Sequence, residues 1–155
     1  MSSFREKMEL SFLERLPSAC RMRMRDEAGK HLKKHNKQQK MKINEFIQKY
    51  RVVQKLVPGM TRTYTPHVIC KDGFKMSVQA GQSLYSEPKD VADSYERAEV
   101  GFPSTEETLL TTYAEDNNNL CDTVYGYVPC SIIDEVIEKH GGIDESKIEA
   151  LSKEK

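Results

Sequence analysis

The stretch YTPHVICKDGFKMSVQA, residues 64–80, decides the fold, because it has the pattern of a β-hairpin. Its Asp72-Gly73 pair is typical of a two-residue type I′ turn, which needs a positive φ at both central positions. This turn places Ile69 opposite Met76, and both side chains share an apolar face with Val78. A hairpin alone is marginally stable in water, so we expect further strands or a helix to cover this face.

The rest of the second half supplies such elements. Alternating apolar residues over 95–102 and β-branched and aromatic residues over 123–128 predict two more strands. Ser104-x-x-Glu107 is a capping box for a short helix. Ser131 is expected to cap an apolar helix that Gly141 ends, and Asp144 to start a last short helix.

The first half has helical patterns. A capping box and an apolar repeat predict a helix over 3–16, and residues 18–38 continue as a basic helix. Apolar residues from Ile43 to Val57 predict a third helix, which Pro58-Gly59 stops. We therefore expect an α+β fold: an N-terminal helical segment, then a mostly antiparallel sheet of about four strands packed against a C-terminal helix. Residues 1–59 form a basic helical segment and residues 60–155 an acidic α+β domain.

The zero formal net charge hides a division between the halves. Residues 1–63 hold 16 Lys/Arg and 6 Asp/Glu, whereas residues 64–155 hold 8 and 18. Such asymmetry indicates a polyanionic partner for one half, a cationic partner for the other, or halves that dock on each other. No apolar run approaches the length of a membrane span and the N-terminus lacks a signal-peptide core, so we expect a protein of the bacterial cytoplasm with thiol cysteines.

Two sets of charged residues are candidates for partner binding. In the second half, an acidic set would mimic a nucleic-acid backbone toward a cationic groove: Glu96, Glu99, Glu106, Glu107, Glu115, Asp116 and Asp122. In the first half, a basic set within residues 21–42 would bind a partner or the phosphates of nucleic acid: Arg21, Arg23, Arg25, Lys30, Lys33, Lys34, Lys37 and Lys40. The second set has no interleaved aromatic residues for base stacking, so its binding to nucleic acid would be nonspecific.

Metal and catalytic patterns are weaker. His67, Cys70, Cys121 and Cys130 would make a His-Cys₃ zinc set, but the last pair is too widely spaced for the usual tight zinc knuckle. The alternative is that these cysteines are small hydrophobic residues. The chain has no phosphate-binding glycine loop and no nucleophile motif, so we predict no catalytic residue and no cofactor.

The segments CKDGFKMSVQA, EVGFPS, YAED, TVYGYVP and EKHGG resemble a family of small, uncharacterised proteins of phages, prophages and other mobile elements, over about residues 68–142. This resemblance implies a setting in which small proteins bind and disable host defence machinery. We therefore expect a non-enzymatic, anti-CRISPR-like inhibitor whose acidic surface binds a host RNA-guided nuclease.

Two alternatives stay open. One is a nonspecific nucleic-acid-binding accessory protein that acts through residues 21–42. The other is a small enzyme or ligand-sequestering protein with a pocket near Tyr85, Tyr125 and Tyr127.

Overall fold

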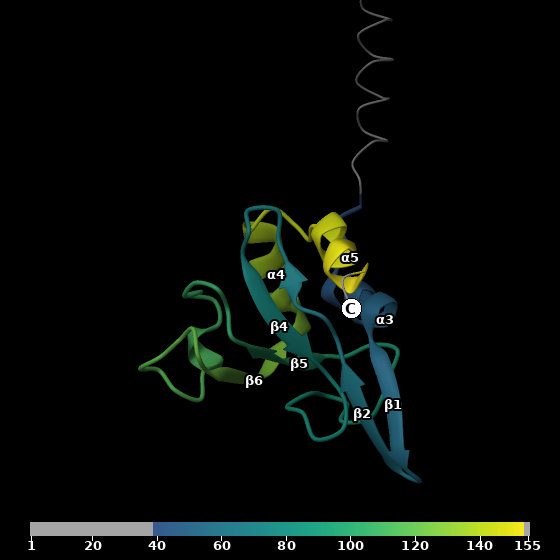
Figure 1. Cartoon of the computed structure of the whole chain (residues 1–155). Helices are drawn as coiled ribbons and strands as arrows, with labels where there is room; N and C mark the ends of the chain where they lie inside the picture. Colours follow the sequence, from purple (N-terminus) through teal and green to yellow (C-terminus); the bar gives the residue numbers. More distant parts are fainter. Residues whose placement is uncertain (1–38, 154–155) are drawn as a thin grey trace, which may run out of the picture. The chain divides into compact units, whose positions relative to one another are not determined.

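The computed structural model describes residues 39–153, so the helices predicted at 3–16 and 18–38 lie outside the described residues. The fold is α+β, as predicted, and the compact unit begins at Lys40 (Figure 1). Its elements, in chain order, are α3 (Ile43–Tyr50), β1 (Val52–Val57), β2 (Met60–Tyr64), β3 (Val68–Ile69), β4 (Lys75–Gln79), β5 (Arg97–Gly101), the 3₁₀ turn η1 (Thr111–Tyr113), β6 (Val124–Pro129), α4 (Cys130–Lys139) and α5 (Glu145–Lys153).

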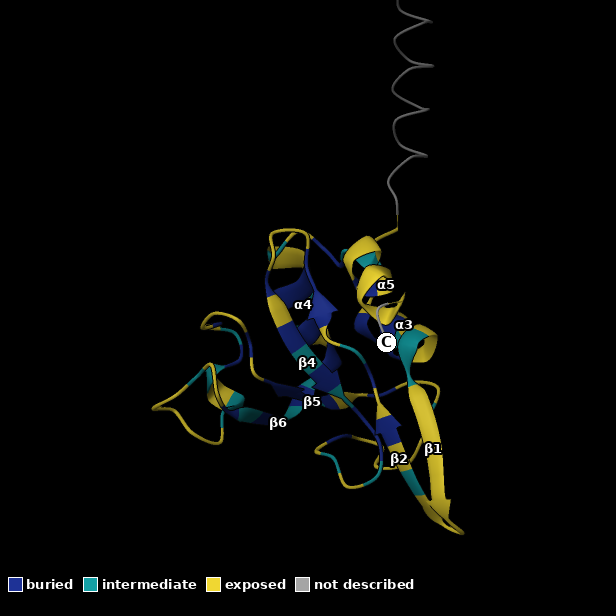
Figure 2. Ribbon diagram, viewed as in Figure 1, coloured by how far each residue is buried: buried dark blue, intermediate teal, exposed yellow. Residues whose placement is uncertain are grey.

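The main sheet is an antiparallel meander with strand order β3-β4-β5-β6, which confirms the predicted four strands. Alternation places one face of these strands in the core, where Met76, Val100 and Tyr125 are fully buried. Helix α4 contributes Ile133 and Val136 to the same core. The core thus runs between this face of the sheet and the helices, as the dark ribbon segments in Figure 2 show.

The register of the β3–β4 hairpin differs from the prediction by one residue. Val68, and not Ile69, lies opposite Met76, because Cys70 pairs with Phe74 around a three-residue loop. The Gly73 backbone at φ +97° supplies the left-handed position that such a loop needs. Ile69 therefore points to the other face, yet it is buried there because the segment leading into α5 pairs alongside it.

The helix predicted from Ile43 to Val57 is wrong in its second half. Helix α3 ends at Tyr50, and β1 follows as the first strand of a separate two-stranded sheet with β2. The Pro58-Gly59 pair therefore makes the turn of this hairpin, where Val57 lies opposite Met60. The predicted boundary between residues 59 and 60 falls inside this hairpin.

Helix α3 is held in the unit by both its apolar and its polar residues. Ile43 and Phe46 are fully buried in the core. The Asp134 carboxylate of α4 accepts the Ile43 N–H at 2.8 Å, so a second helix caps the first. Asn44 donates to the Tyr95 carbonyl at 3.0 Å and accepts its N–H at 2.9 Å, which fixes the approach to β5.

Two further predictions need correction. Pro129, and not Ser131, is the N-cap of helix α4, which begins at Cys130. Gly141 at φ +89° follows the end of this helix as predicted, and its N–H donates to the Glu138 carbonyl. The short helix predicted from Ser104 is absent, and only η1 forms in that region. Within residues 39–153, no helix is long and apolar enough to cross a membrane.

Candidate functional site

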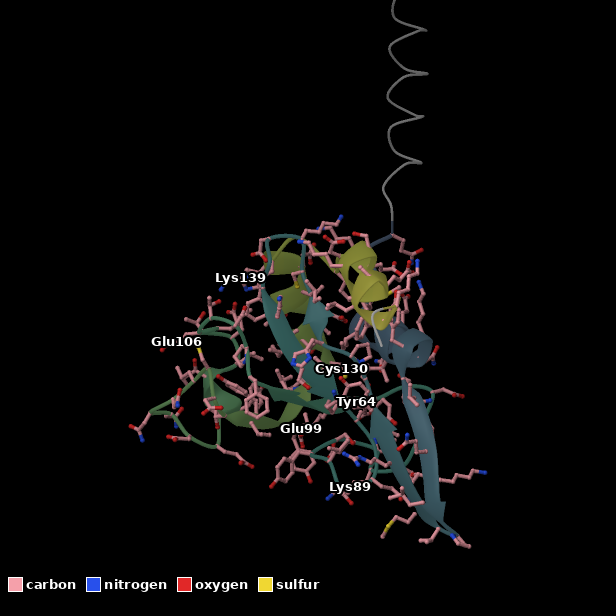
Figure 3. The ribbon with its side chains drawn as sticks, viewed as in Figure 1. Tyr64, Lys89, Glu99, Glu106, Cys130 and Lys139 are labelled. Atoms are coloured by element: carbon pink, nitrogen blue, oxygen red, sulfur yellow. The ribbon has the colours of Figure 1, made fainter. Side chains whose placement is uncertain are left out.

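Five carboxylates gather on the loops around β6 and on the adjoining strand β5. We call this set the acidic face: Glu99, Glu106, Glu115, Asp116 and Asp122. Glu99 is partly exposed and the other four are exposed. Figure 3 labels Glu106 at the left of the unit and Glu99 nearer its lower middle.

Two tyrosines, Tyr85 and Tyr125, lie close to three members of the acidic face. The charge of Glu115, a hydrogen bond to the same carboxylate, burial and the charge of Glu99 together raise the pKa of the Tyr85 hydroxyl. Glu99 also accepts the Tyr85 N–H at 3.1 Å. Burial first, then the charges of Cys121 and Glu106, raises the pKa of Tyr125. Glu99 and Glu115 therefore lie close to Tyr85, and Glu106 lies close to Tyr125.

Backbone hydrogen bonds hold the loop that carries Glu115 and Asp116. The Glu115 N–H donates to the Val124 carbonyl at 3.0 Å, and the Asp116 N–H donates to the Thr123 hydroxyl at 3.1 Å. Asp116 in turn accepts the Asn118 N–H at 2.8 Å. The carboxylates are thus positioned by the start of β6.

None of the five carboxylates forms an ion pair with a basic side chain among residues 39–153. Acidic residues elsewhere in the unit do: Glu145 binds Lys49, and Glu87 lies 3.4 Å from the Arg97 guanidinium. Within residues 39–153 the acidic face therefore has no counter-ion, and repulsion between its carboxylates is unfavourable unless water or a cationic group offsets it.

The remaining predicted charged residues lie elsewhere. Glu96 precedes β5 and so stands at the opposite end of that strand from Glu106. Lys40 is exposed, 3.8 Å from Glu138. The basic residues from Arg21 to Lys37 lie outside the described residues.

Glu107 was predicted to bind a partner, but the residue is only 2% exposed and cannot contact one. One of its oxygens accepts from Lys139 Nζ at 2.8 Å and from the Leu109 N–H at 3.2 Å. The other lies 2.9 Å from His140 Nε2, and His140 Nδ1 lies 2.6 Å from Asp72. We call these four side chains the Glu107 network: Asp72, Glu107, Lys139 and His140.

The Glu107 network joins the β3–β4 loop, the segment before η1 and the end of α4. Burial acts to raise the pKa of Glu107, but the hydrogen bonds from Lys139 and His140 outweigh it and lower that pKa. The pKa of Asp72 is lowered, mainly by the hydrogen bond from the Phe74 N–H and next by the hydrogen bond with His140. Both ring nitrogens of His140 face carboxylates and its ring stacks on Phe74 with the ring centroids 4.0 Å apart, so the ring is held on three sides.

The predicted zinc set does not come together. No group of three or more His, Cys, Asp or Glu residues in the described part of the chain could hold a metal ion. Cys70 and Cys130 are buried, and burial first, with the charge of a nearby aspartate, raises the pKa of each thiol to about 11. These two cysteines have the environment of small hydrophobic residues, whereas Cys121 is exposed.

The three tyrosines of the ligand-pocket alternative do not share one surface. Tyr125 is fully buried in the core, while Tyr85 and Tyr127 pack against each other at 5.6 Å. A groove of about 500 Å³ lies beside Glu99 instead, and Arg62, Ser77 and Phe102 line it with other residues of β2 and β4. No sequence pattern indicated this groove, because its lining comes from segments far apart in the chain.

A scan of protein-family models gave no match to this chain, and neither curated proteins nor solved structures gave a significant one.

Proposed function

We propose that this protein is a non-enzymatic inhibitor from a phage or other mobile element that binds a host RNA-guided nuclease through the acidic face. One observation carries the proposal: the five carboxylates of the acidic face, four exposed and one partly exposed, have no ion-pair partner among residues 39–153. RNA-guided nucleases hold the guide–target duplex in a positively charged channel, which is complementary to such a surface. Charge complementarity of this kind speeds and orients docking.

The arrangement of the acidic face favours a protein partner with a preformed basic surface. Its loop is held by the hydrogen bonds of Glu115 and Asp116 to the start of β6, so little ordering is needed on binding. The resemblance of residues 68–142 to mobile-element proteins supports a defence nuclease as the target.

The test is inhibition of purified RNA-guided nucleases, each loaded with guide RNA and given its DNA target. The variant E106Q/E115Q/D122N removes three charges from the acidic face and leaves Asp116, which caps its own loop. Three screened ion pairs of about 0.5–1 kcal/mol each predict a roughly 10- to 100-fold loss of affinity, steepest at low salt. The matched control E135Q/E138Q/E149Q removes the same charge from α4 and α5 and should inhibit like the wild type.

Two results would overturn the proposal. One is full inhibition by the acidic-face variant. The other is the absence of a protein target, with binding only to nucleic acid that is lost steeply as salt rises. The second result would favour the nonspecific nucleic-acid-binding function of residues 21–42.

A further inference from the structure

Strand β1 is exposed along its whole length. All six of its residues are exposed, as the yellow ribbon of β1 shows in Figure 2. Four are large and apolar: Val52 and Leu56 are 54% exposed, Val53 42% and Val57 57%. Strands are stable when at least one face is covered, and contiguous apolar surface on a soluble protein marks an interaction site.

The hairpin is nevertheless fixed in place. The Thr63 hydroxyl donates to the Ala80 carbonyl at 2.7 Å, and the Thr61 N–H donates to the Gln82 side chain at 2.9 Å. These contacts involve β2, which separates β1 from the rest of the unit (Figure 1). Among residues 39–153 no strand pairs with the outer edge of β1, so this edge presents backbone donors and acceptors on a rigid support.

We propose that this edge binds a second copy of the chain, so that two β1 strands pair antiparallel about a two-fold axis at Gln54. Most soluble oligomers are two-fold homodimers whose interface is self-complementary. The strand VVQKLV carries one charge, on Lys55. With Gln54 opposite Gln54 of the second copy, each Lys55 lies opposite a Val53, so that like charges are not paired.

This register also completes an apolar row. Val52 lies opposite Tyr64 in β2, so the two side chains share a face. In the dimer, Val52 would lie opposite Leu56 of the second copy on the same face. Each half of the resulting four-stranded sheet would then hold a row of Tyr64, Val52 and Leu56 of the second copy. This row explains why Val52 and Leu56 are apolar although they are exposed in the single chain. The irregularity between Lys55 and Val57 bends the strand, so the pairing covers Val52 to Leu56. Leu56 and Tyr64 also line the groove beside Glu99, so the dimer row borders that groove.

The first test is a disulfide cross-link in the full chain. Cys20 and the exposed Cys121 are changed to serine, and Gln54→Cys is introduced. Opposite residues of antiparallel strands have Cα atoms about 4.5–5.5 Å apart, within reach of a disulfide. In the matched control Lys55→Cys, the two cysteines are offset by two residues along the strands, which puts their Cα atoms about 8 Å apart and out of reach. We expect a covalent dimer from the first variant and little from the second under the same oxidation.

The second test measures mass by light scattering over a concentration series. Wild type should approach twice the monomer mass, and Val52→Lys should remain monomeric with an unchanged circular dichroism spectrum. The double variant V52K/L56E should dimerise again, because the lysine introduced at position 52 would face the glutamate introduced at position 56 of the other copy. A monomer mass for wild type throughout the series, or cross-linking of the Lys55→Cys variant as fast as of the Gln54→Cys variant, would overturn the proposal.

Discussion

Replacing Glu107 with glutamine tests whether the Glu107 network stabilises the fold. The substitution keeps the shape of a side chain that is 2% exposed and removes its charge. The amide oxygen can still accept from Lys139 and the Leu109 N–H. The amide nitrogen then faces His140 Nε2, and it can donate to that nitrogen only where the nitrogen carries no hydrogen.

The magnitude follows from the number and exposure of these bonds. Hydrogen bonds to charged groups contribute about 1.5–3 kcal/mol and neutral ones about 0.5–1.5 kcal/mol, so each weakened bond costs about 1 kcal/mol. Lys139 is 51% exposed and recovers part of its loss by hydration, whereas His140 is only 16% exposed. We expect Glu107→Gln to lower the free energy of unfolding by about 2 kcal/mol at pH 7.

The effect should depend on pH with a definite sign. The pKa of Glu107 is lowered in the folded protein, below the value of about 4.3 for an unfolded glutamate. A carboxylate of this kind stabilises the fold above its unfolded pKa, and the contribution is lost as pH falls through the folded pKa. The difference between wild type and Glu107→Gln should therefore be complete at neutral pH and shrink below about pH 4.

The assay is urea unfolding followed by circular dichroism at pH 7 and at acid pH, with the m value checked for constancy. Glu106→Gln is the matched control, because the neighbouring carboxylate is exposed and its loss should change stability by less than about 0.5 kcal/mol. The reasoning is refuted if the two variants are equally stable at pH 7. It is refuted as well if the effect of Glu107→Gln does not change with pH.

Two other predictions concern a glycine and the thiols. Gly81→Ala should destabilise the protein by about 2–4 kcal/mol in urea unfolding, because φ there is +143° and the new Cβ would clash with the Thr63 hydroxyl oxygen. In a Cys20→Ser background, a thiol reagent should modify Cys121 at once, whereas Cys70 and Cys130 should react only on unfolding, since both are buried with a pKa of about 11.

Each of these has a simple check. Gly59→Ala also places a side chain at positive φ, but it meets no atom within 4 Å, so it should cost less than Gly81→Ala. A loss at position 81 no greater than at position 59 would show that the contact with Thr63 is unimportant. Prompt labelling of all three cysteines in the folded protein would contradict the burial of the core thiols.

The main sheet was well predicted from the sequence, because local patterns set it. Alternation and turn residues identified β4, β5 and β6, and the apolar stripe and Gly141 identified α4. The register of β3 was wrong because Asp-Gly suits both a two-residue loop and a three-residue loop with Gly73 in the left-handed conformation. The choice between these loops depends on which face of Val68 and Ile69 is covered, and the covering segment is more than 70 residues away.

The region from Ile43 to Val57 shows a different limit. Its apolar residues fit a helical period throughout, yet Val52-Val53 is β-branched and extends as β1. The strand depends on its partner β2, and the helical period carries no information about that partner.

The candidate sites were predicted on the assumption that charged residues are exposed, and they were correct only where that assumption holds. Glu106 and Glu107 are equivalent in sequence, but one is exposed and the other is buried between Lys139 and His140, about 30 residues later. Partners at such a separation cannot be paired by spacing alone. The composition of the second half predicted an acidic surface. That its carboxylates form no ion pair within residues 39–153 could be seen only in the structure.

The cap on α3 has a consequence for synthesis of the protein. The chain leaves the ribosome from its N-terminus, so the Ile43 N–H emerges 91 residues before the Asp134 carboxylate that accepts it. Until then Phe46 and Ile47 lack the α4 side chains that bury them, and the nascent helix exposes its apolar stripe. Docking of these two helices must therefore wait until α4 has been synthesised, and chaperones have the intervening interval in which to bind α3.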